Sequence, residues 1–299
     1  MEAILQWGID LIVAIQQFHG PALDSIFRAI TFMGEEEFYL LLLPLLFWCV
    51  GVGLGARLAV LFLLSTYLNT DLKDLCQQPR PFDLDPSVQL SSAEGYGLPS
   101  GHSQTAIVVW GTIAAWARQT WFWVAAIALI ALIGFSRIYL GVHFPTDVLA
   151  GWTIGAVLLY IYLLVQPGVE KMLAELSLGV QILLSLAVPV VLVLIHPVQD
   201  TITAMAVLAG MGVGLALMHR YVSFSARGPW WQRAVRFLVG GAVVLALYLG
   251  LKMVFPGEGS ALYLAFRFLR YWLVGLWVSL GAPWLFRRLH LAPEAEGRT

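Results

Sequence analysis

The chain has 299 residues, of which 60% are hydrophobic and only 12% are charged, and its net charge is −1. Soluble domains carry about 25% charged residues, so this composition favours a membrane protein. Apolar runs of the length that crosses a bilayer, roughly 17–25 residues, recur along almost the whole chain. These runs are continuous rather than alternating, which excludes a transmembrane barrel. The basic residues form no cluster, so nothing indicates a nucleic-acid partner.

The first 35 residues precede the first long apolar run. They contain Glu2 and Asp10 and no basic stretch, so we expect an interfacial amphipathic helix rather than a cleaved signal peptide. The rest predicts an all-α polytopic transmembrane helical bundle of about nine spans. The predicted spans are residues 36–52, 57–75, 103–118, 121–139, 146–166, 177–196, 200–218, 232–254 and 261–284. We divide the chain into an N-terminal interfacial segment (1–35), a transmembrane core (36–168) and a C-terminal transmembrane extension (169–299).

The two cysteines, Cys49 and Cys76, fall at opposite ends of neighbouring predicted spans. Their separation would approach the thickness of a bilayer, which is far beyond the reach of a disulfide. We therefore expect both residues to be free thiols.

The basic residues are divided unevenly between the two sides of the predicted bundle. If the polar insertion 76–102 faces one side, the joins 139–146, 196–200 and 254–260 face it too. Ten of the seventeen Lys and Arg then lie on the opposite side, namely Arg57, Arg118, Lys171, Arg220, Arg227, Arg233, Arg236, Arg287, Arg288 and Arg298. The positive-inside rule places these ten in the cytoplasm. The polar insertion is therefore expected to face away from the cytoplasm.

The end of the second predicted span carries Lys73, and a short spacer leads from it to Arg80 and Pro81. The proline places Arg80 on a stiff, non-helical turn. An arginine can hold two phosphate oxygens at once, while a lysine supplies a point charge. Lys73 alone is better explained as a snorkelling side chain at the membrane edge, so only Lys73 and Arg80 together indicate an oxyanion site.

The sequence Pro99-Ser100-Gly101-His102 opens the third predicted span. Exposed amides at a helix start favour anions, and Gly101 allows a ligand to approach the backbone closely. Ser100 alone is equally well explained as an ordinary N-cap. His102 lies beside this anion site, where an imidazole can give a proton to a departing oxygen and later accept one from water.

The third motif, Ser136-Arg137 followed by His143 and Asp147, joins the fourth and fifth predicted spans. Pro145 is typical of a first helical turn, so a helix start can bring the Asp147 carboxylate towards the His143 ring. The carboxylate would then fix the tautomer through one ring nitrogen and leave the other nitrogen free to attack. In isolation, the spacing of this His and Asp is better explained as a simple pairing at a helix N-terminus.

In this order and spacing, the three motifs resemble those of the type 2 phosphatidic acid phosphatase (PAP2) family, over about residues 34–165. The family also includes glucose-6-phosphatases, bacterial acid phosphatases and vanadium haloperoxidases. The sequences at 95–99 and 136–141 look most like membrane members that act on lipid phosphates, including sphingoid-base-phosphate phosphatases. The predicted plan of spans is similar to glucose-6-phosphatase, whereas the extension after residue 166 departs from the shorter bacterial members.

The resemblance implies a role for each fixed motif position. His143 is the nucleophile that forms a phosphohistidine, Asp147 orients it, and His102 is the general acid and then the general base. The phosphoryl group is bound by Lys73, Arg80, Arg137, Ser100 and the amide of Gly101. The chemistry implied by the resemblance requires no metal and no other cofactor, and vanadate should mimic its pentacoordinate state.

We therefore expect a metal-independent phosphatase that hydrolyses a lipid phosphomonoester or diphosphate at the extracytoplasmic face of a membrane. Its partners are the lipid phosphate and the membrane lipids, with no metal and no nucleic acid. The chain carries no retention signal, which favours a bacterial inner (plasma) membrane. Three alternatives stay open: a phosphotransferase or a sugar-phosphate phosphatase with the same site, and a phospholipid transporter that binds phosphate without catalysis.

A few further polar residues have more than one explanation. Glu35, Glu36 and Glu37 precede the first predicted span and could assist a polar headgroup, but a solvated helix N-terminus explains them more simply. Arg267 and Arg270 could meet a second phosphate or an acidic lipid, although snorkelling or internal pairing is favoured. The remaining histidines lack the spacing of metal ligands, so we expect no metal site.

Overall fold

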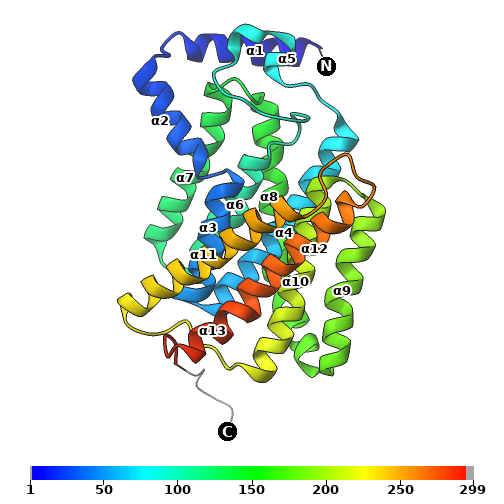
Figure 1. Ribbon diagram of the computed structural model, residues 1–299. Helices are drawn as coiled ribbons and strands as arrows, with labels where there is room; N and C mark the ends of the chain where they lie inside the picture. Colours follow the sequence, from blue (N-terminus) through cyan, green and yellow to red (C-terminus); the bar gives the residue numbers. More distant parts are fainter. Residues whose placement is uncertain (1, 294–299) are drawn as a thin grey trace. The chain divides into compact units, whose positions relative to one another are not determined.

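The structure is a computed structural model that describes residues 2–293. Within these residues every regular element is a helix, in agreement with the all-α prediction (Figure 1). Contacts divide the chain into two compact units. Unit 1 consists of Met1–Tyr39 and Leu68–Leu164, and unit 2 consists of Leu40–Tyr67 and Val165–Thr299. Helices α3, α4 and α8 each run from one unit into the other.

Unit 1 contains the N-terminal helices and the helices that carry the three motifs. Its elements are α1 (Glu2–Gln16), α2 (Pro21–Phe32), the start of α3 (Glu36–Leu45), the end of α4 (Val52–Cys76), α5 (Pro81–Leu84), η2 (Pro86–Val88), α6 (Gly101–Ala117), α7 (Thr120–Tyr139) and most of α8 (Pro145–Glu175). Figure 1 shows α6, α7 and α8 side by side, with α1 running across their ends.

Glycines in α8 allow this helix to pack closely against the start of α6. A Cβ atom on Gly151 would lie 2.5 Å from the carbonyl oxygen of Ser100, and one on Gly155 would lie 2.7 Å from that of Gln104. Small residues of this kind let the backbones of membrane helices approach each other. The amide of Ser100 accordingly donates a hydrogen bond to the carbonyl oxygen of Asp147 at 3.0 Å. The second and third motifs are therefore joined through the main chain.

Helix α1 covers the turn between α7 and α8. Ile9 and Ile12 on its buried face pack in one cluster with Phe144. The side-chain amide of Gln16 donates to the carbonyl oxygen of Tyr139 at 2.8 Å, at the last residue of α7. The N-terminal helix therefore supports the turn that carries the third motif.

Unit 2 contains the remaining helices. Its elements are the end of α3, η1 (Leu46–Val50), the start of α4, the end of α8, α9 (Leu178–Ile195), α10 (Gln199–Tyr221), α11 (Trp230–Val254), α12 (Tyr263–Leu276), η3 (Trp277–Gly281) and α13 (Ala282–Arg288). Helix α10 packs against both α9 and α12. A Cβ atom on Gly275 of α12 would lie 3.0 Å from the amide nitrogen of Met211, so α10 and α12 also cross at a small residue.

Six helical segments among the described residues are long and apolar enough to cross a membrane, so the expected count of nine is not confirmed. The segments are Val52–Leu84, Thr120–Tyr139, Pro145–Glu175, Leu178–Ile195, Gln199–Tyr221 and Trp230–Val254. The predicted span 103–118 coincides with α6, which has only 17 residues. The predicted spans 36–52 and 261–284 coincide with helical runs that contain π-helical segments at Leu46–Val50 and Trp277–Gly281. Hydropathy alone does not separate such runs from a continuous span.

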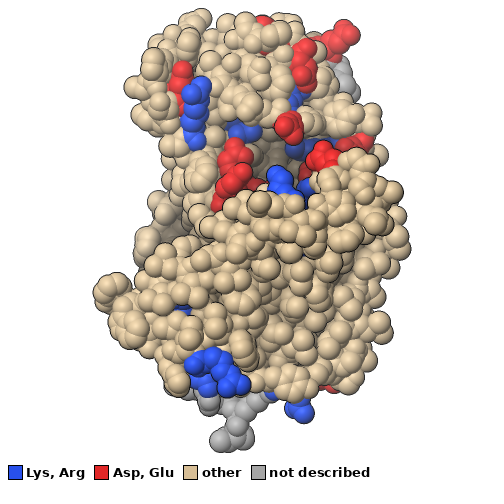
Figure 2. All heavy atoms as spheres, viewed as in Figure 1, with Lys and Arg blue, Asp and Glu red and all other residues tan. Residues whose placement is uncertain are grey.

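The chain is an integral membrane protein with a mostly uncharged surface. Charged atoms cover only small areas of the face shown in Figure 2. Cys49 and Cys76 are both free thiols, as expected, and Cys76 is exposed while Cys49 is buried.

Candidate active site

The turn between α7 and α8 carries His143, and Asp147 follows in the first turn of α8. Pro145 is the first residue of this helix, where its fixed φ angle suits a helix start. The Oδ2 atom of Asp147 accepts a hydrogen bond from the amide of Phe144 at 2.9 Å and lies 3.3 Å from Nδ1 of His143. Both side chains are buried. The structure therefore brings the carboxylate and the imidazole of the third motif together.

The other ring nitrogen of His143 faces Arg80. Nη1 of Arg80 lies 3.1 Å from Nε2 of His143 and donates to the carbonyl oxygen of Val142 at 2.8 Å. A guanidinium can only donate hydrogen bonds, so we assign Nε2 as the acceptor and place the ring proton on Nδ1, facing Asp147. This tautomer leaves a lone pair on Nε2, which is what a nucleophilic imidazole needs.

Arg80 is also bonded to the polar insertion that follows α5. Its Nε donates to the carbonyl oxygen of Gly95 at 2.8 Å, and its Nη2 donates to that of Glu94 at 2.6 Å. The backbone of Arg80 is extended, as expected for a residue before proline. Arg80 is thus a buried, fixed cation, and most of its donors serve main-chain carbonyl groups in this structure.

Ser100 caps the N-terminus of α6. Its hydroxyl oxygen accepts from the amide of Ser103 at 3.4 Å and from the Ser103 hydroxyl at 3.0 Å, so the N-cap explanation is confirmed. At Gly101 a Cβ atom would lie 3.0 Å from Oδ1 of Asn69 in α4. Asn69 also donates to the side chain of Gln104 at 2.9 Å. The close approach that Gly101 permits is therefore made by Asn69, which connects the end of α4 to the start of α6.

His102 lies in the first turn of α6, and the segment between α2 and α3 covers it. Gly34 packs against the imidazole, because a Cβ atom there would lie 2.5 Å from its Cδ2. Oε1 of Glu35 lies 3.2 Å from Nε2 of His102. Nε2 is nevertheless buried without a hydrogen-bond partner among residues 2–293. This nitrogen therefore lies beside a negative charge but is not engaged by an aligned acceptor.

Arg137 lies in the last turn of α7 and is buried. Its Nη1 donates to Oγ1 of Thr31 at 2.6 Å and lies 3.8 Å from Oε1 of Glu35. Its Nε has no hydrogen-bond partner within the described part of the chain, as is also the case for Nε2 of His102. Buried polar atoms without partners are rare in folded proteins, and an anion with several oxygens could satisfy both of these.

Lys73 lies in the last turn of α4. The positive charges of Lys73 and Arg137 act on both imidazoles, so His102 and His143 belong to one cationic region of unit 1. His143 lies outside the membrane-spanning helices. Burial, together with the charges of Arg137 and Arg80, holds the pKa of His143 well below its ordinary value of 6.5. The imidazole of His143 is therefore neutral at neutral pH.

Sequence reasoning did not assign three polar residues that contact this region, namely Gln78, Asn69 and Thr31. It favoured a solvated helix N-terminus for a fourth, Glu35, which lies beside His102. Gln78 Nε2 donates to Oδ1 of Asp147 at 2.6 Å and so occupies the second carboxylate oxygen. Asn69 lies one helical turn before Lys73, so their shared helix face was a usable signal. The other contacts join segments that are far apart in the sequence, which no local pattern reveals.

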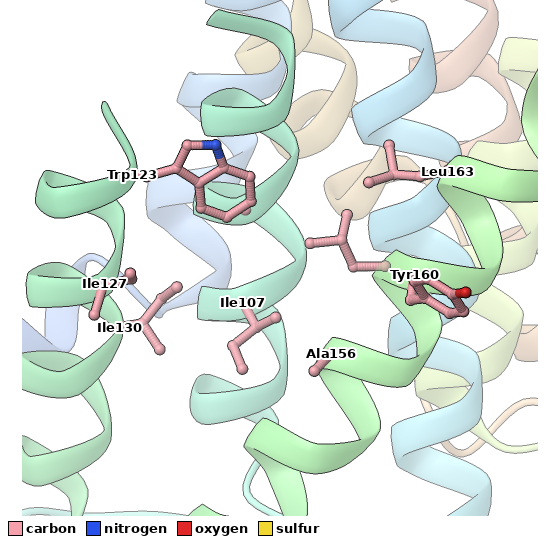
Figure 3. A pocket seen from close by; sticks show the side chains of 9 residues that line it. Ile107, Trp123, Ile127, Ile130, Ala156, Tyr160 and Leu163 are labelled. Atoms are coloured by element: carbon pink, nitrogen blue, oxygen red, sulfur yellow. The ribbon is translucent and has the colours of Figure 1, made fainter. Parts of the chain in front are cut away.

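An apolar groove of about 390 Å³ lies between α6, α7 and α8 (Figure 3). Its lining is formed by Ile107, Gly111, Trp123, Ile127, Ile130, Ala156, Leu159, Tyr160 and Leu163. The same three helices carry His102, Arg137 and Asp147. Ile107 lies five residues beyond His102, or about 8 Å along the helix at 1.5 Å per residue. The groove suits a hydrocarbon chain that starts close to the polar region.

Comparison with known families gives two matches in this chain. A sequence profile of the PAP2 superfamily matches residues 54–170. A second profile, described as the PAP2 superfamily phosphatase, transmembrane extension, matches residues 202–294. The first match includes every residue of the three motifs, and the second lies within unit 2.

The curated relatives include two named lipid phosphatases. The chain is 28% identical to lipid phosphate phosphatase delta of Arabidopsis thaliana, over 56% of this chain and 44% of that protein. It is 33% identical to phosphatidylglycerophosphatase B of Bacillus subtilis, over 47% of this chain and 74% of that protein. The match therefore spans less than half of the plant relative.

One solved structure with a similar fold is the transmembrane PAP2-type phosphatidylglycerolphosphate phosphatase from Bacillus subtilis. The two chains superpose with a TM-score of 0.50 and are 26% identical in sequence. The similarity covers 59% of this chain and 90% of the Bacillus chain. A large part of the present chain therefore has no counterpart in that structure.

Proposed function

Because the chain belongs to the PAP2 superfamily, we propose that it is a metal-independent phosphatase that hydrolyses a lipid phosphate through a phosphohistidine at His143. The observation that carries this proposal is the series of contacts from Arg80 through His143 to Asp147. These contacts leave the ring proton on Nδ1 and a lone pair on Nε2. A buried, neutral imidazole held in this way is prepared to attack phosphorus before the substrate arrives.

In the first step, Nε2 of His143 attacks phosphorus. The P–N bond forms, and the bond between phosphorus and the lipid oxygen breaks. Asp147 stabilises the positive charge that develops on the imidazole. His102, protonated in the complex with the anionic phosphate, gives its proton to the departing oxygen. As the lone pair of Nε2 is used, the hydrogen bond from Nη1 of Arg80 transfers to a phosphoryl oxygen.

In the second step, water attacks the phosphohistidine. His102, now neutral, takes a proton from this water, and the new P–O bond forms as the P–N bond breaks. The electron pair of the broken bond returns to Nε2 of His143. Inorganic phosphate then leaves, and His102 holds the proton that the next cycle requires.

The oxygens of the phosphoryl group carry negative charge in both transition states, and preorganised donors lower the energy of that charge. We assign this task to the cations and to the start of α6, namely to Lys73, Arg80, Arg137, Ser100 and Gly101. The unsatisfied Nε of Arg137 supports this assignment. Among residues 2–293, no cluster of three or more His, Cys, Asp and Glu side chains is placed to hold a metal ion.

We propose a lipid substrate for two reasons. Both named relatives carry a lipid phosphate or phospholipid in their names. The apolar groove between α6, α7 and α8 (Figure 3) also offers a place for a hydrocarbon chain whose phosphate lies at His102 and Arg137. The reacting phosphate can be a monoester or the terminal group of a diphosphate, since either one supplies a phosphoryl group and a leaving oxygen.

We further propose that the site faces the extracytoplasmic side of a bacterial inner membrane. The uneven distribution of basic residues along the sequence supports this orientation. Cys76 provides a test, because it is exposed and lies three residues after Lys73 at the end of α4, whereas Cys49 is buried. A membrane-impermeant thiol reagent is expected to label Cys76 in intact cells. Labelling only after the cells are opened would place the site on the cytoplasmic side.

The main test of activity is phosphate release by the purified full-length protein without an acceptor alcohol. The panel contains phosphatidate, a sphingoid-base phosphate, phosphatidylglycerophosphate, undecaprenyl diphosphate and glucose 6-phosphate, each with and without EDTA. We expect release from at least one lipid, no effect of EDTA, and inhibition by vanadate. Loss of activity on chelation, with recovery on adding a divalent ion, would contradict the metal-independent mechanism.

The same assay separates the alternatives. Turnover that requires an added hydroxyl acceptor indicates a phosphotransferase, and turnover of glucose 6-phosphate alone indicates a sugar-phosphate phosphatase. A phospholipid transporter would release no phosphate from any substrate in the panel. It would also bind phosphate equally well after the change His143→Ala.

A further inference from the structure

Helix α12 in unit 2 carries two arginines in an otherwise apolar sequence of 14 residues. Arg267 donates from Nε to Oγ1 of Thr203 at 2.8 Å and from Nη1 to the hydroxyl of Tyr263 at 2.7 Å. Thr203 lies in the first turns of α10, which starts at Gln199. Arg267 is therefore level with one end of a membrane-spanning helix, and Arg270 lies about one turn further along α12.

Arg270 is only 7% exposed. Its guanidinium lies 4.9 Å from the ring centre of Tyr271 and 5.7 Å from that of Tyr248. Its Nε is buried and has no hydrogen-bond partner, and neither Arg270 nor Arg267 forms an ion pair with a carboxylate in the part of the chain that the structure describes. The carboxylate of Glu258 approaches only the Tyr263 hydroxyl, at 3.4 Å.

Arg236 in the same unit shows what a purely structural buried arginine looks like. Its side chain is fully buried, and its Nη1 and Nη2 donate to the carbonyl oxygens of Trp48 and Arg227 at 2.8 and 2.9 Å. Arg270, by contrast, has a buried Nε without a hydrogen-bond partner among residues 2–293. The two buried arginines therefore differ in whether the protein itself satisfies the guanidinium.

A buried cation without an anion or an acceptor is strongly unfavourable, particularly in a membrane protein. The two tyrosine faces offset only part of this cost, because a cation–π contact contributes about 0.5–2 kcal/mol. Two guanidinium groups one helical turn apart match an anion with several oxygens, and arginine binds phosphate through such pairs of contacts. Their level at a helix end is also the level at which phospholipid headgroups lie.

We propose that Arg267 and Arg270, framed by Tyr248 and Tyr271, bind a phosphate oxyanion at a site in unit 2 that is separate from the His102–His143 region of unit 1. The phosphate group of an anionic phospholipid supplies the ligand, and free phosphate has the same chemistry. The guanidinium groups contact the phosphate oxygens, and the tyrosine rings hold the arginines in place.

The experiment uses purified full-length protein in a neutral detergent and measures the thermal unfolding midpoint. Phosphatidylglycerol, phosphatidylcholine or inorganic phosphate is added to the wild type and to Arg270→Gln and Arg267→Gln. Arg288→Gln is the matched control, because Arg288 is exposed and also lies over an aromatic ring, 5.6 Å from the centre of Trp284. His143→Ala keeps the unit 2 residues and shows whether the increment depends on the nucleophile proposed for unit 1.

We expect phosphatidylglycerol to raise the midpoint of the wild type, Arg288→Gln and His143→Ala above the value in phosphatidylcholine. The increment should disappear in Arg270→Gln and shrink in Arg267→Gln, whose half-buried position makes it the variant that folds most readily. The same Arg270-dependent increment with inorganic phosphate alone would identify free phosphate as sufficient. An equal increment in the wild type and both arginine variants, or no increment with either ligand, would overturn the proposal.

Discussion

The two sides of the His102–His143 region are held in different ways. On one side, Nδ1 of His143 faces Asp147 and Nε2 faces Arg80, so both ring nitrogens have a protein partner. On the other side, Nε2 of His102 and Nε of Arg137 are buried and have no hydrogen-bond partner among the residues described. In the proposed mechanism, the protein itself thus orients the nucleophile, whereas a bound anion completes the proton-donor side.

This division follows from what each side has to do. A nucleophile gains from being oriented before the substrate binds, because less entropy is then lost in reaching the transition state. A phosphate site whose donors were already satisfied by protein groups would have to lose those contacts on binding. Glu35 places a carboxylate beside this second side, with its Oε1 3.2 Å from Nε2 of His102 and 3.8 Å from Nη1 of Arg137.

Replacement of the two histidines should separate the sides most clearly. His143→Ala is expected to lower kcat by about a thousandfold or more on every substrate, because no P–N bond can form.

His102→Asn should lower kcat by about 10²–10⁴ on a lipid phosphate. Its effect on the first step with p-nitrophenyl phosphate should be much smaller, since that leaving group needs no proton. Measurement of the p-nitrophenol burst and of kcat checks both effects. Equal losses of the first step in His102→Asn for both leaving groups would contradict its role as proton donor.

Asp147→Asn should have the next largest effect. The carboxylate holds the proton of His143 on Nδ1, and loss of such a group costs about 10²–10⁴ in kcat when the wrong tautomer forms. Gln78→Ala is the matched control, because the side-chain amide of Gln78 donates to the other carboxylate oxygen of Asp147, at 2.6 Å. Loss of one such hydrogen bond costs about tenfold. If Asp147→Asn lost no more activity than Gln78→Ala, the tautomer assignment would be wrong.

The change Glu35→Gln should have a smaller effect than Asp147→Asn, and it should strengthen the binding of an anion. The contact with His102 and the charge of Arg137 hold the pKa of Glu35 below its ordinary value, so its negative charge is present at neutral pH. Removal of this charge is expected to tighten vanadate inhibition about fivefold, which is the order of one charge–charge contact near water. Glu37→Gln removes the same charge two residues away at an exposed position and should leave inhibition unchanged. Weaker inhibition in Glu35→Gln than in the wild type would show that Glu35 supports anion binding instead.

The pH dependence should be the smallest effect. Because the pKa of His143 is held well below 6.5 in the folded protein, the acid limb of kcat/KM that belongs to this residue should lie below pH 6.5. Stability should also fall as the pH drops below this value, since the unfolded chain takes up a proton there that the folded chain does not. His143→Ala should lack this part of the decrease in a thermal unfolding series. An acid limb at or above pH 6.5 that is retained in His102→Asn would contradict the burial of a neutral nucleophile.

The sequence predicted those parts of the fold that depend on local patterns. The starts of α6 and α8 follow from the N-cap Ser100 and from Pro145, and long apolar runs gave the positions of α7, α9, α10 and α11. The number of spans was not predictable in the same way. The π-helical segments at Leu46–Val50 and Trp277–Gly281 interrupt α-helices without changing the hydropathy of the sequence.

The same distinction holds for the site. The cations and histidines were identified because each lies in a short motif, and the structure brings these motifs together in unit 1. Thr31 was not assigned, and Glu35 was explained as part of a solvated helix N-terminus. Both contact Arg137 or His102 from a segment about 70–100 residues away, where no spacing rule applies. The roles of the motif residues remain predictions that the experiments above test.

The most direct measurement is the position of the covalent phosphate. His102→Asn should form the phosphoenzyme from p-nitrophenyl phosphate but hydrolyse it slowly, because the base for the second step is missing. Rapid quenching at alkaline pH, followed by mass spectrometry of the peptides, should find phosphate on Nε2 of His143 and on no peptide of His143→Ala. Phosphate on His102 or another residue in the wild type, or steady turnover with no phosphohistidine at any time, would contradict His143 as the nucleophile.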